Sequence, residues 1–321
     1  MKLRDNRGGG GMILISGEAL IDLIPDPDKD GRYDAVLGGS PYNVAIGLGR
    51  LGAPTSFVSR ISADANGENL AAALTRDGVD LSLIARDARP TPLAFVMRGT
   101  AQTGSRYSFY LDATAFDGRW PFPLLWPDGA RHLHVGSIAA VDPRHGESVV
   151  AALRLARARA TTSFDPNIRP LVTPGRGSVV ALVERQVSLS SVVKASEEDL
   201  EWLYPDRAIE TTLEQWARLG PSFCVATLGD RGAVAFLGDR RLTVAAPKVE
   251  VVDTVGAGDS FMSSLLAAMD RDGALGAGAP APSVDRLEAW LAFAATASAI
   301  TCTRKGSDPP TAAQVAEYEK F

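Results

Sequence analysis

Residues 253–261 read Asp253-Thr254-Val255-Gly256-Ala257-Gly258-Asp259-Ser260-Phe261, and two different patterns meet there. The residues before them, Val249-Glu250-Val251-Val252, favour the end of a strand, whereas apolar residues after them recur at helical spacing. We therefore expect a strand that turns into a helix. Gly256 and Gly258 allow a tight bend, and the free N–H groups of a first helical turn attract an anion. Asp259 is either a plain N-cap or a reactive carboxylate at this anion site.

Strand and helix patterns alternate on both sides of this turn. Strands are expected at 12–16, 57–61, 132–137, 161–164 and 191–195, and helices at 70–74, 146–159, 176–186 and 197–204. This alternation predicts a largely parallel sheet covered by helices on both faces. Two segments, at about 20–37 and 91–112, contain strand patterns without helices and predict a small β lid. Phe95, Phe109 and Phe116 are expected in the lid core, with contact to a ligand as the alternative.

Composition limits the function classes. The chain has 321 residues, 45% of them hydrophobic, which is enough for one large core, and we expect a main domain over residues 12–321 after a disordered leader at 1–11. Its formal net charge is -5 without any block of basic residues, so we expect no nucleic acid and no membrane as partner. The longest weakly polar run, residues 289–302, is shorter than the about 20 residues that span a bilayer.

The potential metal ligands lack metal-site spacing. Cys224 and Cys302 lie in apolar runs, which favours reduced thiols in a cytoplasmic protein. His132, His134 and His145 form no paired motif with a carboxylate, so we assign them to structure.

Three segments carry a resemblance to a known family. Residues 253–261 resemble the C-terminal signature of the ribokinase-like sugar kinases, the PfkB family, and Gly38-Gly39-Ser40-Pro41-Tyr42-Asn43 resembles its N-terminal signature. Asp165-Pro166-Asn167-Ile168-Arg169 is similar to the fructokinase form of the family. The resemblance covers residues 12 to about 315. It implies a three-layer α/β ribokinase-like fold, with a mostly parallel central sheet, helices on both faces and a small β-sheet lid.

The resemblance also implies a reaction, which is transfer of the γ-phosphoryl group of ATP to a sugar hydroxyl with Mg²⁺ present. Asp259 would be the general base, and the amides of Gly256, Ala257 and Gly258 would hold the migrating phosphoryl group. Arg169 would point a fixed cation at sugar and phosphate. A surface salt bridge from Arg169 to Asp165 is the alternative.

Sugar contacts are implied near the N-terminus. The segment Gly17-Glu18-Ala19-Leu20-Ile21-Asp22 looks like the opening of fructokinase-type members, in which the aspartate matching Asp22 binds sugar hydroxyls. Gly38 and Gly39 would let the backbone approach the sugar, and Asn43 would donate and accept hydrogen bonds. The alternatives are a surface-facing Asp22 and a plain glycine turn capped by Ser40.

Nucleotide and ion contacts are implied further along the chain. Residues Lys194, Thr227, Gly229 and Gly232, with Gly256 and Gly258, would face ATP. Asp199 would influence Mg²⁺ through water, although a capped, acidic first helical turn explains it equally well. Asp253 and the loop after residue 300 would hold K⁺ if potassium activates the protein.

Several functions compete. Fructose is our best single substrate, and ribose, 2-keto-3-deoxygluconate and nucleosides remain alternatives. A silent sugar-binding regulatory protein is the alternative from another class. Residues 47–52 match G-x-G-x-x-G, but these glycines fall inside and at the end of an expected helix, so we reject a dinucleotide site. Lids of this family often pair, so we expect a homodimer.

Overall fold

A nine-stranded sheet runs through the computed structural model, which describes residues 11–26, 28–97, 106–122, 126–173 and 175–318. In spatial order its strands are β13 (Arg240–Val244), β12 (Ala233–Leu237), β11 (Phe223–Thr227), β10 (Val192–Ser196), β9 (Thr161–Asp165), β8 (Ala130–Gly136), β1 (Met12–Ser16), β4 (Thr55–Ser62) and β5 (Ile84–Asp87). Neighbouring strands are parallel, except that β12 runs antiparallel to both β11 and β13. The expected mostly parallel sheet is confirmed.

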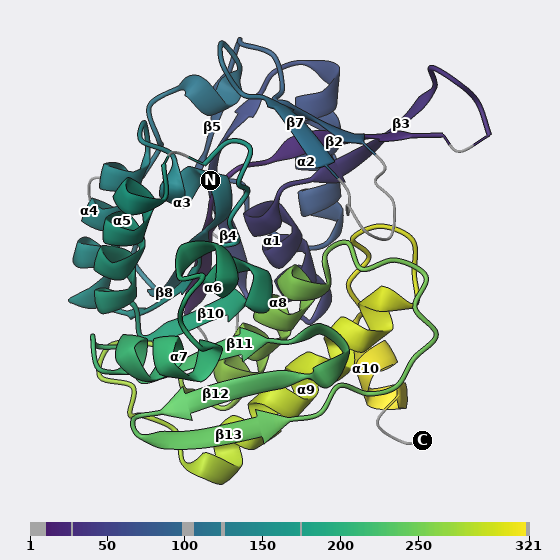
Figure 1. The fold of residues 1–321 in the computed structure, drawn as a ribbon. Helices are drawn as coiled ribbons and strands as arrows, with labels where there is room; N and C mark the ends of the chain where they lie inside the picture. The colour runs from purple at the N-terminus through teal and green to yellow at the C-terminus, as the bar shows by residue number, and fades with distance from the viewer. Residues whose placement is uncertain (1–10, 27, 98–105, 123–125, 174, 319–321) are drawn as a thin grey trace.

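Helices cover both faces of this sheet (Figure 1). One layer contains α1 (Ser40–Arg50), α2 (Ala65–Arg76), α8 (Ala257–Arg271) and α9 (Val284–Cys302). The other contains α3 (Ser137–Val141), α4 (Gly146–Arg157), α5 (Arg176–Ser188), α6 (Glu197–Leu203) and α7 (Ile209–Ala217). The short helix α10 (Ala312–Tyr318) packs on α9. The three-layer α/β architecture is therefore confirmed, and residues 47–52 lie within and just after α1, as expected.

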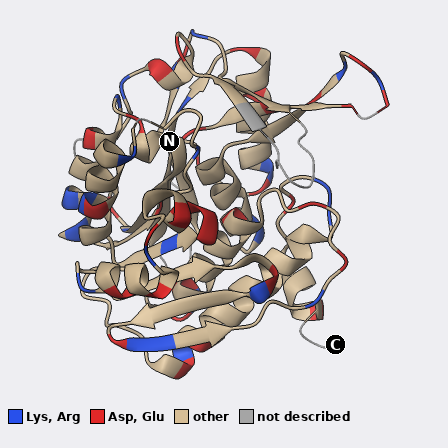
Figure 2. Ribbon diagram, viewed as in Figure 1, with Lys and Arg blue, Asp and Glu red and all other residues tan. Residues whose placement is uncertain are grey.

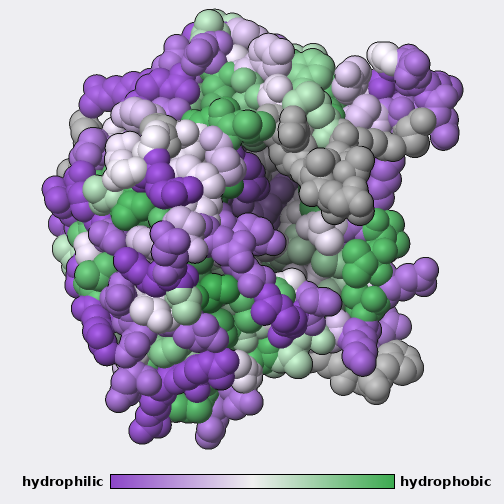
Figure 3. Space-filling model, in the orientation of Figure 1, coloured by the Kyte–Doolittle hydropathy of each residue, from purple (hydrophilic) through white to green (hydrophobic). Residues whose placement is uncertain are grey.

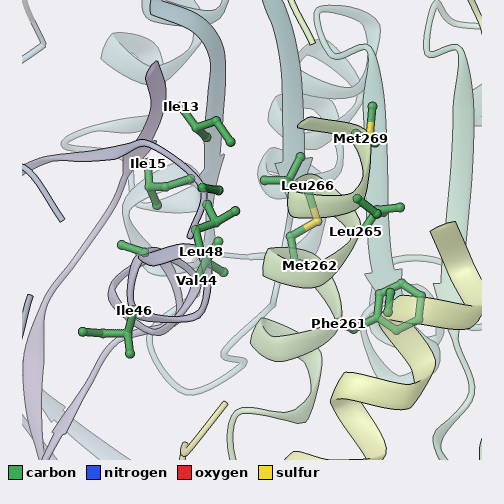
Figure 4. Close-up of a cluster of buried hydrophobic side chains, with 14 of the residues drawn as sticks. Ile13, Ile15, Val44, Ile46, Leu48, Phe261, Met262, Leu265, Leu266 and Met269 are labelled. Atoms are coloured by element: carbon green, nitrogen blue, oxygen red, sulfur yellow. The ribbon is translucent and has the colours of Figure 1, made fainter. Parts of the chain in front are cut away.

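Helix α8 is central to one of the two large apolar clusters of the described residues. Its residues Phe261, Met262, Leu265, Leu266 and Met269 are all buried because they recur at helical spacing on one side. They belong to one cluster with Ile13 and Ile15 of β1 and with apolar residues of α1 (Figure 4). This packing fixes the start of α8 relative to the start of α1, which contains the N-terminal signature.

A second sheet has the order β3-β2-β6-β7, from β2 (Leu20–Pro25), β3 (Tyr33–Gly38), β6 (Leu93–Met97) and β7 (Arg106–Tyr110). It projects from one end of the molecule (Figure 1) and corresponds to the expected lid. The turn expected between β6 and β7 lies outside the described residues, as does most of the expected leader, residues 1–10.

Side chains alternate between the two lid faces. Asp22 pairs with Ala94, which in turn pairs with Phe109, so these three residues share one face. Phe95 lies on the opposite face, where its ring packs edge-on against Tyr33 and Tyr110. Contact between Phe95 and a ligand beside Asp22 is therefore excluded in this arrangement.

One expected strand is absent. Residues 249–252 form no strand. The last strand before them, β13, ends at Val244, and the chain then continues without regular structure to the start of α8. Val251 and Val252 are 59% and 62% exposed. The β-branched residues in this segment favour a strand. The preceding Pro247, however, has no N–H that could donate to a neighbouring strand. The edge strand β13 has already ended before this segment begins.

The remaining composition-based expectations concern cysteines and membranes. Cys224 is buried and Cys302 half-buried, and both thiols are free. In the part of the chain that the structure describes, no helix combines the length and apolar character needed to cross a bilayer.

Candidate active site

Helix α8 starts at a left-handed glycine. Gly256 has φ +77°, and a β-carbon there would lie 2.1 Å from Ser307 Oγ, so only glycine fits this turn without strain. The N–H of Ala257 already donates to Thr254 O at 3.2 Å, which closes the turn. The turn therefore places Gly256, Ala257 and Gly258 at the positive end of a 15-residue helix.

Asp259 lies in the first turn of α8 and contacts the start of α1. Its Oδ1 accepts a hydrogen bond from Ser40 Oγ at 2.6 Å, and its Oδ2 accepts one from Asn43 Nδ2 at 2.8 Å. Asp259 is not the N-cap, because Gly256 occupies that position without a side-chain hydrogen bond. Ser40 is likewise no cap, since α1 starts after Gly39. The two family-like signatures, more than 200 residues apart in sequence, therefore meet at one carboxylate.

A second carboxylate, that of Asp22, belongs to lid strand β2. Burial raises the pKa of Asp22 to about 6, although Arg169 opposes the shift, and the charge of Asp259 adds to it. Asp22 is thus close enough to interact with both residues and is not a solvent-facing strand residue. A β-carbon on Gly38 would lie 2.2 Å from Asp22 Oδ2, which explains why glycine occupies that position. A β-carbon on Gly39, which has φ +109°, would lie 2.6 Å from Glu18 O.

Glu18 was not assigned a role from the sequence. It is fully buried, and Ala139 N–H donates to its Oε2 at 3.1 Å. Burial raises its pKa, while Ser137, Ala139 and Arg169 act in the opposite direction. Arg169 is half-buried, donates to Ile168 O at 3.2 Å and lies within electrostatic reach of both Glu18 and Asp22.

The alternative partner of Arg169 is wrong. Asp165 is 1% exposed and pairs with Lys194, whose Nζ lies 2.8 Å from Asp165 Oδ2. Asp165 is the last residue of β9, and Lys194 is the middle residue of the adjacent parallel strand β10. The pair thus lies near the sheet edge formed by the carboxyl ends of the strands, where ligands bind in α/β sheets. A β-carbon on Gly258 would lie 2.9 Å from Lys194 Nζ, so the ammonium lies against the first turn of α8.

The acidic residues expected near ions are engaged by backbone groups. Asp199 forms a capping box with Ser196 at the start of α6, and its Oδ1 accepts a hydrogen bond from Ile168 N at 2.6 Å. The capping interpretation is thereby confirmed, and a water-mediated contact to Mg²⁺ stays a prediction. In Figure 2 the red ribbon of α6 marks the acidic residues of this helix. Asp253 accepts hydrogen bonds from Val255 N at 3.0 Å and Gly306 N at 2.9 Å, which joins the α8 turn to the loop after α9.

Three of the expected nucleotide residues, Thr227, Gly229 and Gly232, lie at the β11–β12 connection. Thr227 ends β11, and Gly229 follows with φ +59°. Gly232 has φ +88°, and a β-carbon on it would lie 2.0 Å from Val244 O, so close backbone packing already requires glycine there. Among the described residues, no three His, Cys, Asp or Glu side chains converge in an arrangement that could hold a metal ion directly.

The site contains residues from distant parts of the chain. Asp22, Asn43, Arg169, Lys194 and Asp259 converge around the start of α8, and Figure 3 shows this face hollowed below the lid. Ser40, Glu18 and Asp165 also belong to it. All three lie inside the motifs described above, but the sequence did not indicate their partners. In the structure, Ser40 contacts Asp259, Glu18 interacts electrostatically with Arg169, and Asp165 pairs with Lys194.

Known proteins resemble the whole chain. The model described as pfkB family carbohydrate kinase matches residues 11–313. A fructokinase of Rhizobium leguminosarum bv. trifolii is 38% identical over 269 residues, which cover 82% of this chain and 81% of that protein. A fructokinase of Klebsiella pneumoniae is 31% identical over 299 residues, covering 92% and 95%.

Solved structures agree with these sequence relatives. A fructokinase with bound ATP from Xylella fastidiosa superposes with a TM-score of 0.86 at 26% identity, over 96% of this chain and 98% of that one. A Vibrio cholerae fructokinase in its fructose, ADP and calcium ion bound form gives a TM-score of 0.82 at 27% identity, over 97% and 99%.

Proposed function

Because the chain belongs to the pfkB family of carbohydrate kinases, we propose that it transfers the γ-phosphoryl group of ATP to a hydroxyl of fructose. The observation that carries this proposal is the position of Asp259, which lies at the start of α8 and accepts hydrogen bonds from Ser40 and Asn43. The names of the relatives favour fructose over ribose, 2-keto-3-deoxygluconate and nucleosides. Residues 12–321 would form the single kinase domain.

Asp259 would act as the general base. Its carboxylate accepts a proton from the attacking sugar hydroxyl once that hydroxyl replaces one of the present donors, Ser40 or Asn43. The first turn of α8 would stabilise negative charge on the migrating phosphoryl group through the helix dipole and the backbone N–H groups of Gly256, Ala257 and Gly258. The N–H of Ala257 would exchange its present contact with Thr254 O for a phosphoryl oxygen. Base and anion site would then lie within one helical turn, which suits an in-line transfer.

The sugar would bind between the lid and α1. Asp22 offers carboxylate oxygens, and Asn43 keeps donor and acceptor capacity beyond its contact with Asp259. Gly38 and Gly39 leave room where side chains would intrude. Arg169 would face both sugar and phosphate, because it already interacts with Asp22 across this space.

Nucleotide and ions would occupy the other side of α8. Lys194 lies in β10, Thr227 ends the adjacent β11, and Gly229 and Gly232 lie in the connection from β11 to β12. We therefore assign the ATP phosphates and ribose to this edge of the sheet. Mg²⁺ bound to ATP would neutralise phosphate charge. Both Asp199 oxygens accept backbone hydrogen bonds, so Asp199 fits Mg²⁺ only through water. K⁺ beside Asp253 remains a proposal of the same kind.

Replacing Asp259 with asparagine tests the base directly. Asp259→Asn keeps the shape of the side chain and removes the proton acceptor, so we expect kcat to fall by about 10²–10⁴-fold, with little change in the KM for ATP. The matched control is Asp285→Asn, which changes an exposed first-turn aspartate of α9 and should leave kcat unchanged. Full turnover by Asp259→Asn would refute the base.

A sugar panel tests the substrate. ADP formation should be highest with fructose, compared with ribose, 2-keto-3-deoxygluconate and a nucleoside at equal concentrations. Tight binding of a sugar in calorimetry without any ADP formation would instead favour the silent sugar-binding protein.

A further inference from the structure

A buried ion pair lies directly beneath the first turn of α8. The side chains of Lys194 and Asp165 are 4% and 1% exposed, and their charged atoms are 2.8 Å apart. Lys194 Nζ also lies 2.9 Å from the point where a β-carbon on Gly258 would be. The pair therefore places an ammonium group at the end of α8 that already attracts anions.

Several ionisable groups surround this ammonium. Asp165 of β9, Asp199 of α6 and Asp259 of α8 all interact electrostatically with Lys194. From β8, His134 stays neutral near neutral pH, because burial and the charge of Lys194 lower its pKa to about 3. Asp199 is held by Ile168 and Ser196, and Asp259 by Ser40 and Asn43. Asp165 is thus the carboxylate that bonds the ammonium directly.

Asp165 has little other bonding in the structure. Its Oδ1 is buried and has no hydrogen-bond partner among the described residues. Burial raises the pKa of Asp165 to about 6 despite the opposing effect of Lys194. Removing two charges from water costs more than their attraction usually returns, so such a pair contributes little to stability. A role in the site accounts better for its presence.

The lysine depends on this carboxylate for its charge. Burial alone would lower the pKa of Lys194, but Asp165, followed by Asp199 and Asp259, raises it above the ordinary value. A buried lysine that loses its bonded carboxylate commonly becomes neutral near physiological pH. An ammonium offers three N–H donors, so one can stay on Asp165 while others reach a phosphate.

We propose that Asp165 is a positioning residue that keeps Lys194 charged and directed at Gly258, so that the phosphates of the nucleotide meet a fixed ammonium. The proposal rests on the kinase function above, because it assigns the nucleotide phosphates to the start of α8. Asp165 itself touches neither substrate in this arrangement.

The test is the affinity for ATP as a function of pH, measured by calorimetry between pH 7 and 9 without sugar. In the wild type, affinity should stay flat because Lys194 remains charged. In Asp165→Asn, the Kd for ATP should rise about tenfold across this range, because a buried lysine without its bonded carboxylate loses its charge as the pH rises. Lys194→Met should bind ATP weakly at every pH.

Two further variants make the result specific. Arginine stays charged without a partner, so adding Lys194→Arg to Asp165→Asn should abolish the pH dependence. Asp270→Asn is the matched control, because it breaks another ion pair, the half-buried one with Arg131, at the other end of α8. It should lower the unfolding temperature and leave the pH profile of ATP binding flat.

The outcomes separate this proposal from the proposed function. A flat profile in Asp165→Asn would overturn the positioning role even if the wild type phosphorylates fructose. ATP binding with the expected pH dependence, but no sugar phosphorylation, would overturn only the kinase function. Should Asp165→Asn fail to fold, Asp165→Glu replaces it, since it moves the ammonium without discharging it. Its ATP affinity should fall equally at all pH values, and an unchanged affinity would overturn the proposal.

Discussion

A comparison of Gly256 with Gly52 distinguishes the cost of a left-handed backbone angle from the role of the α8 turn in catalysis. Gly256 and Gly52 both have φ +77°, but a β-carbon would meet Ser307 at Gly256 and open space at Gly52. We expect Gly52→Ala and Gly256→Ala each to lose about 1 kcal/mol of unfolding free energy from the left-handed angle. Gly256→Ala should lose more through overlap with Ser307, and its kcat should fall at least about tenfold because the α8 turn moves. Urea denaturation and initial rates measure both effects, and equal kcat values in the two variants would contradict the role of the turn.

We expect the ionised Asp22 side chain to lower the free energy of unfolding while it binds the sugar. Its pKa is raised from 3.8 to about 6, so the folded protein holds a proton that the unfolded chain releases between these values. Its contribution to stability therefore falls as pH rises from 3.8 to about 6 and stays constant above that. We expect Asp22→Asn to be more stable than the wild type at pH 7.5, by on the order of 2 kcal/mol, and less so at pH 5.

The same substitution should weaken the sugar site. Asp22→Asn replaces two charged acceptor oxygens with one neutral acceptor and an NH2 donor, so the KM for fructose should rise while the KM for ATP stays constant. In the wild type, the KM for fructose should rise as the pH falls below about 6, where Asp22 gains a proton. A lower stability of Asp22→Asn at pH 7.5 would contradict the burial cost that we assign to this carboxylate.

At the level of elements, the start of α6 distinguishes capping from metal binding. Ser196 and Asp199 bond to each other's backbone N–H groups at the start of this helix. We expect Ser196→Ala and Asp199→Asn each to lower the unfolding free energy by about 1 kcal/mol. If Asp199 also acts on Mg²⁺ through water, Asp199→Asn alone should need more Mg²⁺ for half-maximal rate. Identical Mg²⁺ titrations of the two variants would leave capping as its whole role.

The spacing of apolar residues predicted most of the helices and strands, but it did not show which strands form pairs. Helical and strand spacing predicted α4, α5, α6 and most strands of the main sheet, because one-sided burial leaves a period in the sequence. The same reasoning failed at residues 249–252, where β-branched residues have no neighbouring strand to pair with. Propensity describes what a segment tolerates, and pairing decides whether a strand forms.

For the whole molecule, we predict a dimer formed by the lid. Its face opposite Asp22 exposes Tyr33, Met97 and Tyr110, with exposed fractions of 46%, 45% and 59%. A cluster of exposed aromatic and apolar side chains on one sheet face favours association with a second copy. Light scattering should give twice the chain mass of 33.8 kDa. Tyr110→Glu should shift the mass to a monomer, whereas Tyr318→Glu, on α10, should not.

The sequence by itself determined the family, the layered α/β fold, the lid and the residue types of the site. These depend on local spacing and on short motifs, which a single chain displays directly, and the family match over residues 11–313 confirms the assignment. Only the tertiary structure determined which side chains of the site contact one another. In the structure, Ser40 and Asn43 donate hydrogen bonds to Asp259. Asp165 forms its ion pair with Lys194, not with Arg169. Such pairings form between strands and helices that are distant in sequence, so they depend on how the layers pack, which no local pattern records.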